Sequence, residues 1–215
     1  MEALSFRAFN EEFFTKRADR LAEIYRHIDT IRLSEFDMRI SGPENGWLEV
    51  NFILDRREVF TFEPSDSFTP FPDLKAWLTD MLNFTKVPSK SFTVDCESYE
   101  TIFSYDYIGN IKTKKTCEPS VFIQIGDDTP VDEEKSMIQF IVPVRQFVSV
   151  FYFKLRDYMI ENRRLFSRNW SLYPNGDFDI RRLMRSFVSK SIESELDSMN
   201  SHTGDLGHWP LIRIK

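Results

Sequence analysis

The sequence has few glycines, and they are scattered: seven occur among 215 residues. A dinucleotide-binding loop needs the spacing GxGxxG, a phosphate-binding loop needs GxxxxGK followed by serine or threonine, and neither occurs. The GxSxG turn that carries the nucleophile of many hydrolases is also missing. We therefore expect no nucleotide cofactor, and no catalytic motif can be named.

Cysteine and histidine are rare as well, with two and three residues. Cys96 and Cys117 do not form a CxxC pair and have no histidine beside them, so the sequence carries no redox or zinc motif of that kind. His202 and His208 flank Asp205 in the C-terminal tail, a spacing that could converge only loosely on an ion. We expect two structural cysteines and no metal site.

An excess of basic residues is also lacking, because 28 lysines and arginines face 34 acidic residues and the net charge is −6. A surface that follows nucleic-acid phosphates needs concentrated positive charge, so we expect no nucleic-acid partner. The pairs Arg163-Arg164 and Arg181-Arg182 leave room for a local basic face. We interpret them as solvated residues at helix ends or on helix surfaces.

Long apolar runs are absent too. The most apolar segment, residues 137–155, is interrupted by Pro143 and two charged residues, whereas a membrane span needs about 18 or more apolar residues. The N-terminus shows no basic region followed by an apolar run. We expect a cytoplasmic protein without a membrane partner.

Phenylalanine is abundant, with 21 residues, and aromatic residues make up 15% of the chain. Each phenylalanine can bury a large apolar area. Most of them fall at periodic positions, which favours a role in the core, and a minority could line a partner site. At this length the core needs no disulfide or metal to supplement it.

The first part of the chain alternates helix and strand patterns. Apolar residues at spacings of three and four predict an amphipathic helix over about residues 10–30. Alternation then predicts three strands between residues 35 and 62, joined through a hairpin loop at 41–46 into an antiparallel meander. Pro72 suits the first turn of a helix that continues through residues 74–82 with an unbroken helical period.

Four or five strands follow between residues 92 and 142, with a turn at Gly109-Asn110. Residues 143–166 fit both helical period and strand alternation, and we favour helix because Pro143 suits a first turn. A further helix is predicted over residues 178–196. The tail, about residues 200–215, is predicted as a loop that ends in a short packed segment.

Runs of strands separated by helices are typical of α+β proteins rather than of βαβ repeats. We therefore predict an α+β fold in which amphipathic helices pack on an antiparallel sheet of about six to eight strands. The sequence shows no low-complexity linker, so we predict a single domain over residues 1–215.

A dense acidic run lies between the last two predicted strands. Paired carboxylates can act in acid/base catalysis when their environments differ, but runs in polar loops are usually solvated. The alternative to a solvated loop is a contact surface for a basic partner protein. Our candidate partner-binding residues are Asp127, Asp128, Asp132, Glu133 and Glu134.

The segment FTPFPDLKAWL at residues 68–78, together with IVPVRQF at residues 141–147, resembles uncharacterised bacterial cytosolic proteins, some of them of immunity-protein type. The resemblance implies an inhibitor that neutralises a secreted toxin by surface complementarity. It transfers no functional residue, because that group has no catalytic motif to match.

Three hypotheses follow. The first is a non-enzymatic protein-binding module, of which an immunity-type inhibitor is one form. The second is an enzyme whose site is assembled from scattered Asp, Glu, Tyr and His residues, and a deep apolar pocket with converging titratable groups would favour it. The third is a structural or assembly subunit, suggested by the phenylalanine content.

Overall fold

A computed structural model describes residues 2–67, 70–97, 99–112, 117–127, 137–170 and 180–201. The helices are α1 (Glu2–Arg26), the short 3₁₀ helix η1 (Ile28–Thr30), α2 (Phe71–Leu82), α3 (Val144–Glu161), α4 (Arg163–Asn169), α5 (Ile180–Phe187) and α6 (Lys190–Ser201). The strands are β1 (Phe36–Glu44), β2 (Trp47–Leu54), β3 (Arg57–Phe62), β4 (Ser89–Asp95), β5 (Glu100–Lys112), β6 (Cys117–Asp127) and β7 (Met137–Pro143).

In the described part of the chain, seven strands form two antiparallel sheets with the orders β1-β2-β3 and β4-β5-β6-β7. The prediction of an α+β fold with an antiparallel arrangement of six to eight strands is confirmed. The strands are divided between two sheets, however, which the alternation patterns could not reveal. The amide of Ser34 donates to the carbonyl of Ile141 at 2.7 Å, which ties the entry to β1 to strand β7.

The meander β1-β2-β3 turns twice through residues with left-handed backbone conformations. Asn45 and Gly46, with φ of 50° and 85°, connect β1 to β2, where Glu44 pairs with Trp47. Such two-residue turns match the twist of the flanking strands. The predicted hairpin at residues 41–46 is therefore confirmed. Its turn is shorter than the predicted loop and consists of Asn45 and Gly46.

Gly109 does not make the predicted turn. Strand β5 runs through it, and the pairing with β6 shifts register between Tyr107 and Gly109. Gly109 has φ of 102°, a conformation that glycine adopts without strain, so the residue allows a bulge within one long strand. Lys112 is the last residue of β5, and residues 113–116 lie outside the described residues.

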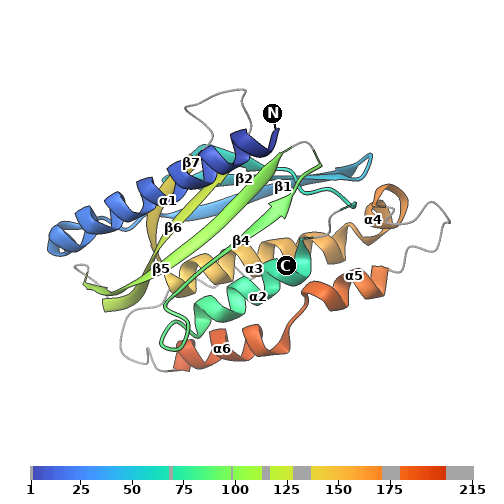
Figure 1. Cartoon of the computed structure of the whole chain (residues 1–215). Helices are drawn as coiled ribbons and strands as arrows, with labels where there is room; N and C mark the ends of the chain where they lie inside the picture. The colour runs from blue at the N-terminus through green and yellow to red at the C-terminus, as the bar shows by residue number, and fades with distance from the viewer. Residues whose placement is uncertain are drawn as a thin grey trace.

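One face of both sheets packs against α2 and α3 in an aromatic core (Figure 1). Phe147 of α3 lies at its centre, with its ring 4.6 Å from that of Phe36 in one sheet and 5.7 Å from that of Trp77 in α2. Trp77 in turn contacts Phe103 of the other sheet at 5.8 Å. The buried core thus includes residues of both sheets, and the phenylalanines supply much of it, as predicted.

Helix α1 covers the opposite face of the four-stranded sheet, so this sheet lies between helical layers (Figure 1). Ile24 of α1 packs there with Phe122 and Ile141. Their strand neighbours, including Val121 and Ile123, point into the aromatic core instead. This is the alternation expected of strands that are buried on both faces.

Two predicted helices are each interrupted. Residues 143–166 form α3 and then α4, which meet at Asn162. The predicted helix over residues 178–196 is divided into α5 and α6 at Val188 and Ser189, where the Tyr152 hydroxyl accepts the Ser189 amide at 2.8 Å. A tertiary contact therefore replaces one helical hydrogen bond. None of the helices in the described part of the chain is long and apolar enough to cross a membrane.

Candidate functional site

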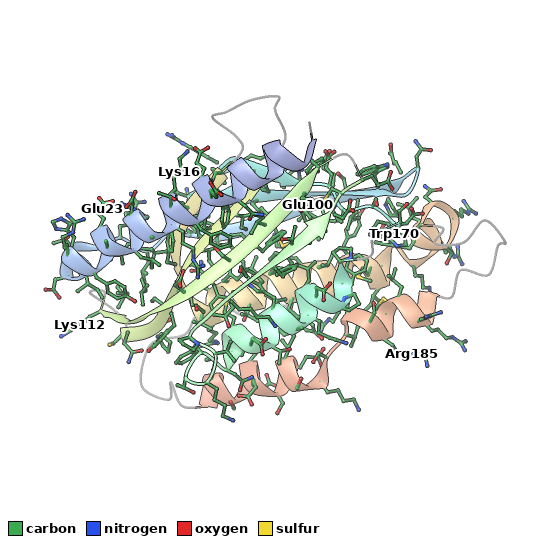
Figure 2. All side chains as sticks on the ribbon, in the orientation of Figure 1. Lys16, Glu23, Glu100, Lys112, Trp170 and Arg185 are labelled. Carbon is green, nitrogen blue, oxygen red and sulfur yellow. The ribbon has the colours of Figure 1, made fainter. Side chains whose placement is uncertain are left out.

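Arginines gather where α3 ends and α4 and α5 follow. Helix α4 has the sequence RRLFSRN and helix α5 has IRRLMRSF, so the two carry six arginines and no acidic residue. All six side chains are exposed. Figure 2 shows one of them, Arg185, directed away from the body of the protein. This concentration stands out in a chain whose net charge is −6.

These helices line an open surface depression of about 570 Å³, which we call the arginine groove. Its lining residues are Ile160, Arg163, Arg164, Ser167, Arg181 and Met184. The groove thus joins three guanidinium groups and one hydroxyl to two apolar side chains. Ile160 is 48% exposed, an unusual state for a large apolar residue on this protein.

Buried aromatic residues fix the two helices and turn the arginines outward. Phe166 and Trp170 are fully buried, and their rings lie 5.7 Å apart. Phe71 of α2 contacts both Trp170, at 5.6 Å, and Phe187 of α5, at 6.0 Å. Because one face of α4 and one face of α5 are held in this way, the charged residues of both helices remain at the surface.

Polar contacts connect the same region to the β1–β2 hairpin. The Asn169 side-chain amide donates to the carbonyl of Pro43 at 2.9 Å, and the Tyr158 hydroxyl donates to the carbonyl of Gly42 at 2.5 Å. Lys75 of α2 donates to the carbonyl of Arg185 at 3.3 Å. The frame of the groove is therefore supported from the sheet and from α2.

The arginines at the N-terminal half of the groove have no carboxylate partner. Within the described residues, neither Arg163 nor Arg164 forms an ion pair. Ser167 donates its hydroxyl to the carbonyl of Arg163 at 2.8 Å and is itself exposed. A ligand can therefore reach two guanidinium groups and one hydroxyl within a single helix.

A second depression lies between α1 and the start of β7, and it carries charges of both signs. It is lined by Lys16, Asp19, Arg20, Glu23, Arg26, His27, Met137 and Gln139. Lys16 pairs with Glu12 and Arg20 pairs with Glu23. Figure 2 shows Lys16 and Glu23 along α1. Because Lys16 and Arg20 already have carboxylate partners, this surface offers less to a charged ligand than the arginine groove does.

The titratable groups with strongly raised pKa values lie in the core rather than in either depression. Burial raises the pKa of the Cys96 thiol to about 12, so the thiol is protonated and unreactive at neutral pH. Burial also raises the pKa of Tyr105, whose hydroxyl donates to the carbonyl of Val87 at 3.0 Å. The Cys96 thiol and the Tyr105 hydroxyl are therefore held in hydrogen bonds within the folded core.

Carboxylates and a tyrosine lie near one another where β3 and β5 adjoin. Partial burial raises the pKa of Glu63, and the nearby Glu49 raises it further. Burial raises the pKa of Tyr99, with smaller contributions from Cys96 and Glu63. No group of three or more histidine, cysteine or acidic residues within the described ranges could hold a metal ion.

The structure describes one member of the predicted acidic contact surface. Asp127 is the last residue of β6 and is 8% exposed. Asp128, Asp132, Glu133 and Glu134 lie outside the described residues, as do His202 and His208. The acidic contact surface stays a prediction.

The arginine pairs Arg163-Arg164 and Arg181-Arg182 are visible in the sequence, but nothing local shows that they converge. The signal that could have joined them is the repetition of two short, acid-free segments with three arginines each, at residues 163–169 and 180–187. The two segments lie together because both contact α2, and a local sequence pattern does not show such contacts.

The chain matches no protein-family model, no curated protein and no solved structure. The geometry of the arginine groove is therefore the main guide to function.

Proposed function

We propose that this protein is a non-enzymatic binding protein that holds an acidic segment of a partner protein in the arginine groove. The observation that carries the proposal is the convergence of Arg163, Arg164 and Arg181 over the apolar side chains of Ile160 and Met184. Guanidinium groups bind carboxylates through paired hydrogen bonds, and apolar contacts supply most of the remaining affinity.

The apolar floor favours a protein segment over nucleic acid as the ligand. Ile160 and Met184 would cover an apolar side chain of the partner, whereas a nucleic-acid backbone offers charge alone to such a surface. The net charge of −6 also repels a long polyanion, while a short acidic segment meets mainly the local arginines.

The chemistry of the buried groups supports binding over catalysis. The pKa of Cys96 and that of Tyr152 are both raised to about 12, chiefly by burial, so both groups are protonated at neutral pH. Tyr152 donates to Glu193 at 2.9 Å and thereby holds the junction of α5 and α6. Tyr152 therefore has a role in the frame of the groove, and Cys96 is a core residue.

An immunity-type inhibitor is the specific form of binding protein that the resemblance implies. In that form the partner is a toxin, the setting is the bacterial cytoplasm, and occupation of the arginine groove covers an acidic part of the toxin. A basic toxin would instead meet the acidic run of residues 127–134.

The test compares two variants with the same change in charge. Arg163→Gln, Arg164→Gln and Arg181→Gln remove the groove arginines, while Arg56→Gln, Arg57→Gln and Lys86→Gln remove three exposed cations elsewhere. The probe is a synthetic peptide with leucines flanked by glutamates, and binding is followed by NMR chemical shifts.

We expect shifts at Ile160, Ser167 and Met184 in the wild type and in the control variant. The groove variant should bind at least about tenfold more weakly, as expected when charged contacts worth about 1.4 kcal/mol are lost. Equal binding by the two variants would show that the peptide recognises net charge only and would contradict the proposal.

A further inference from the structure

The arginine groove offers more positive charge and more donors than a single carboxylate can use. Arg163, Arg164 and Arg181 contribute three guanidinium groups to one depression. Each guanidinium is a planar fork with five N–H donors, suited to paired contacts with oxygen. A carboxylate has one negative charge and two oxygens, whereas a phosphorylated side chain carries about −1.5 to −2 and has three terminal oxygens.

We infer that the arginine groove recognises a phosphorylated side chain of the partner segment, beside an apolar side chain that rests on Ile160 and Met184. This inference depends on the proposed function and makes it more specific. The phosphoryl group would lie between the arginines of α4 and Arg181 of α5, and the apolar neighbour would cover the floor.

The local charge balance supports a doubly charged ligand. Helices α4 and α5 contain no acidic residue, and Arg163 and Arg164 have no ion pair within the part of the chain that the structure describes. Glu161, at the end of α3, is exposed but is not among the residues that line the groove. A phosphoryl group would balance the two positive charges of Arg163 and Arg164.

Ser167 supplies a neutral donor in the same place. Its hydroxyl donates to the Arg163 carbonyl, 2.8 Å away and four residues earlier in the helix. A hydroxyl can rotate without moving the backbone, so it can donate to a bound phosphoryl oxygen instead. Recognition of phosphorylated motifs by arginine clusters is a general mode of peptide binding.

The experiment uses the full chain and peptides of one sequence that differ at one position. That position, next to a leucine, is phosphoserine, glutamate or serine, and the dissociation constants are measured by calorimetry. We expect the phosphopeptide to bind at least tenfold more tightly than the glutamate peptide, and the serine peptide more weakly still. Inorganic phosphate alone should bind weakly, because it lacks the apolar contact.

Two substitutions examine the geometry without changing the fold. Arg164→Lys keeps the charge but loses the planar fork, so the preference for phosphoserine over glutamate should fall several-fold. Arg56→Lys, at an exposed turn, is the matched control and should leave the preference unchanged. Ser167→Ala should weaken the phosphopeptide several-fold and leave the glutamate peptide nearly unaffected.

The outcomes separate the inference from the proposed function. Equal binding of the phosphoserine and glutamate peptides would overturn the inference and leave the proposed function standing. If neither peptide bound, both would fail. A single-stranded oligonucleotide that bound as tightly as the phosphopeptide, with the same loss in Arg164→Lys, would overturn the inference in favour of a nucleic-acid ligand.

Discussion

Helix α1 and the pair α4–α5 are both rich in arginine, but the two regions use arginine differently. Arg17 of α1 forms two hydrogen bonds of 2.7 Å with Asp106 of β5, and both side chains are largely buried. Arg163 and Arg164 of α4 are exposed and have no carboxylate partner within the described residues. Arginine therefore contributes to the stability of the α1 side, while Arg163 and Arg164 of α4 are available to a ligand.

The two regions are also attached differently. Helix α1 rests on an aliphatic cluster around Ile24 and uses polar contacts, among them the Gln124 side-chain amide, which donates to the carbonyl of Phe13 at 2.7 Å. Helices α4 and α5 are anchored through aromatic rings, above all Phe166 and Phe187. Aromatic anchoring leaves Arg163 and Arg164 without a carboxylate partner among the described residues, and five predictions test this difference.

The largest effect is expected for an aromatic anchor. Phe166→Ala should lower the free energy of unfolding by about 3–5 kcal/mol, because a buried phenylalanine leaves a cavity when it is truncated. The control is Phe14→Ala on α1, where the ring is 40% exposed and the loss should be much smaller. Denaturant unfolding measures both, and equal losses would contradict aromatic anchoring.

The next effect concerns the ion pair that fixes α1. Arg17→Gln should cost about 1–3 kcal/mol, because Asp106 is left with a poorly solvated carboxylate. The exposed pair Arg20–Glu23 is the comparison, and Arg20→Gln should cost less than about 0.5 kcal/mol. Adding Asp106→Asn to Arg17→Gln should recover part of the loss. If Arg17→Gln cost no more than Arg20→Gln, Arg17 would not differ from surface arginines.

A smaller effect is expected where Tyr152 holds the junction of α5 and α6. Tyr152→Phe should cost about 1–2 kcal/mol, because the Ser189 amide and Glu193 each lose a hydrogen-bond partner. The exposed Tyr25→Phe is the control. Equal stabilities of the two variants would contradict a role for this hydroxyl.

The same residue predicts a pH dependence. Burial raises the pKa of Tyr152 from 10.0 to about 12, so its stabilising contribution is complete below pH 10 and is lost as the pH rises from 10 to about 12. The free energy of unfolding should fall less steeply over that range in Tyr152→Phe than in the wild type. Parallel curves would show that Tyr152 ionises as readily in the folded protein as in the unfolded chain.

The smallest effect on stability is expected in the arginine groove. The double variant Arg163→Gln, Arg164→Gln should change the free energy of unfolding by less than about 0.5 kcal/mol, since exposed side chains without partners contribute little. Thermal or denaturant unfolding would measure it. A loss of about 2 kcal/mol or more would show that these arginines are structural, like Arg17.

Much of the fold follows from local sequence. The apolar period of residues 74–82 identifies α2, and the alternation in residues 47–54 identifies β2. Both patterns can be recognised locally, because the spacing of the buried residues follows from the geometry of a single helix or strand. The fold class then follows from the order of the elements. Gly109 was misread because a positive φ suits a bulge as well as a turn.

The remaining features depend on contacts between distant residues. The division into two sheets is set by pairings that alternation does not specify, and the break between α5 and α6 is set by Tyr152, 37 residues before Ser189. The arginine groove is of the same kind. Its residues come from three helices whose positions are fixed by Phe71, Trp170 and Phe187.

The most direct measurement is an NMR titration of the wild type and of the Arg163→Gln, Arg164→Gln, Arg181→Gln variant with the leucine–glutamate peptide. If the groove is the binding site, resonances of Ile160 and Met184 move during titration of the wild type and move much less at the same peptide concentrations in the variant. Movement confined to α1, or identical titrations of the two proteins, would place binding elsewhere and contradict the account.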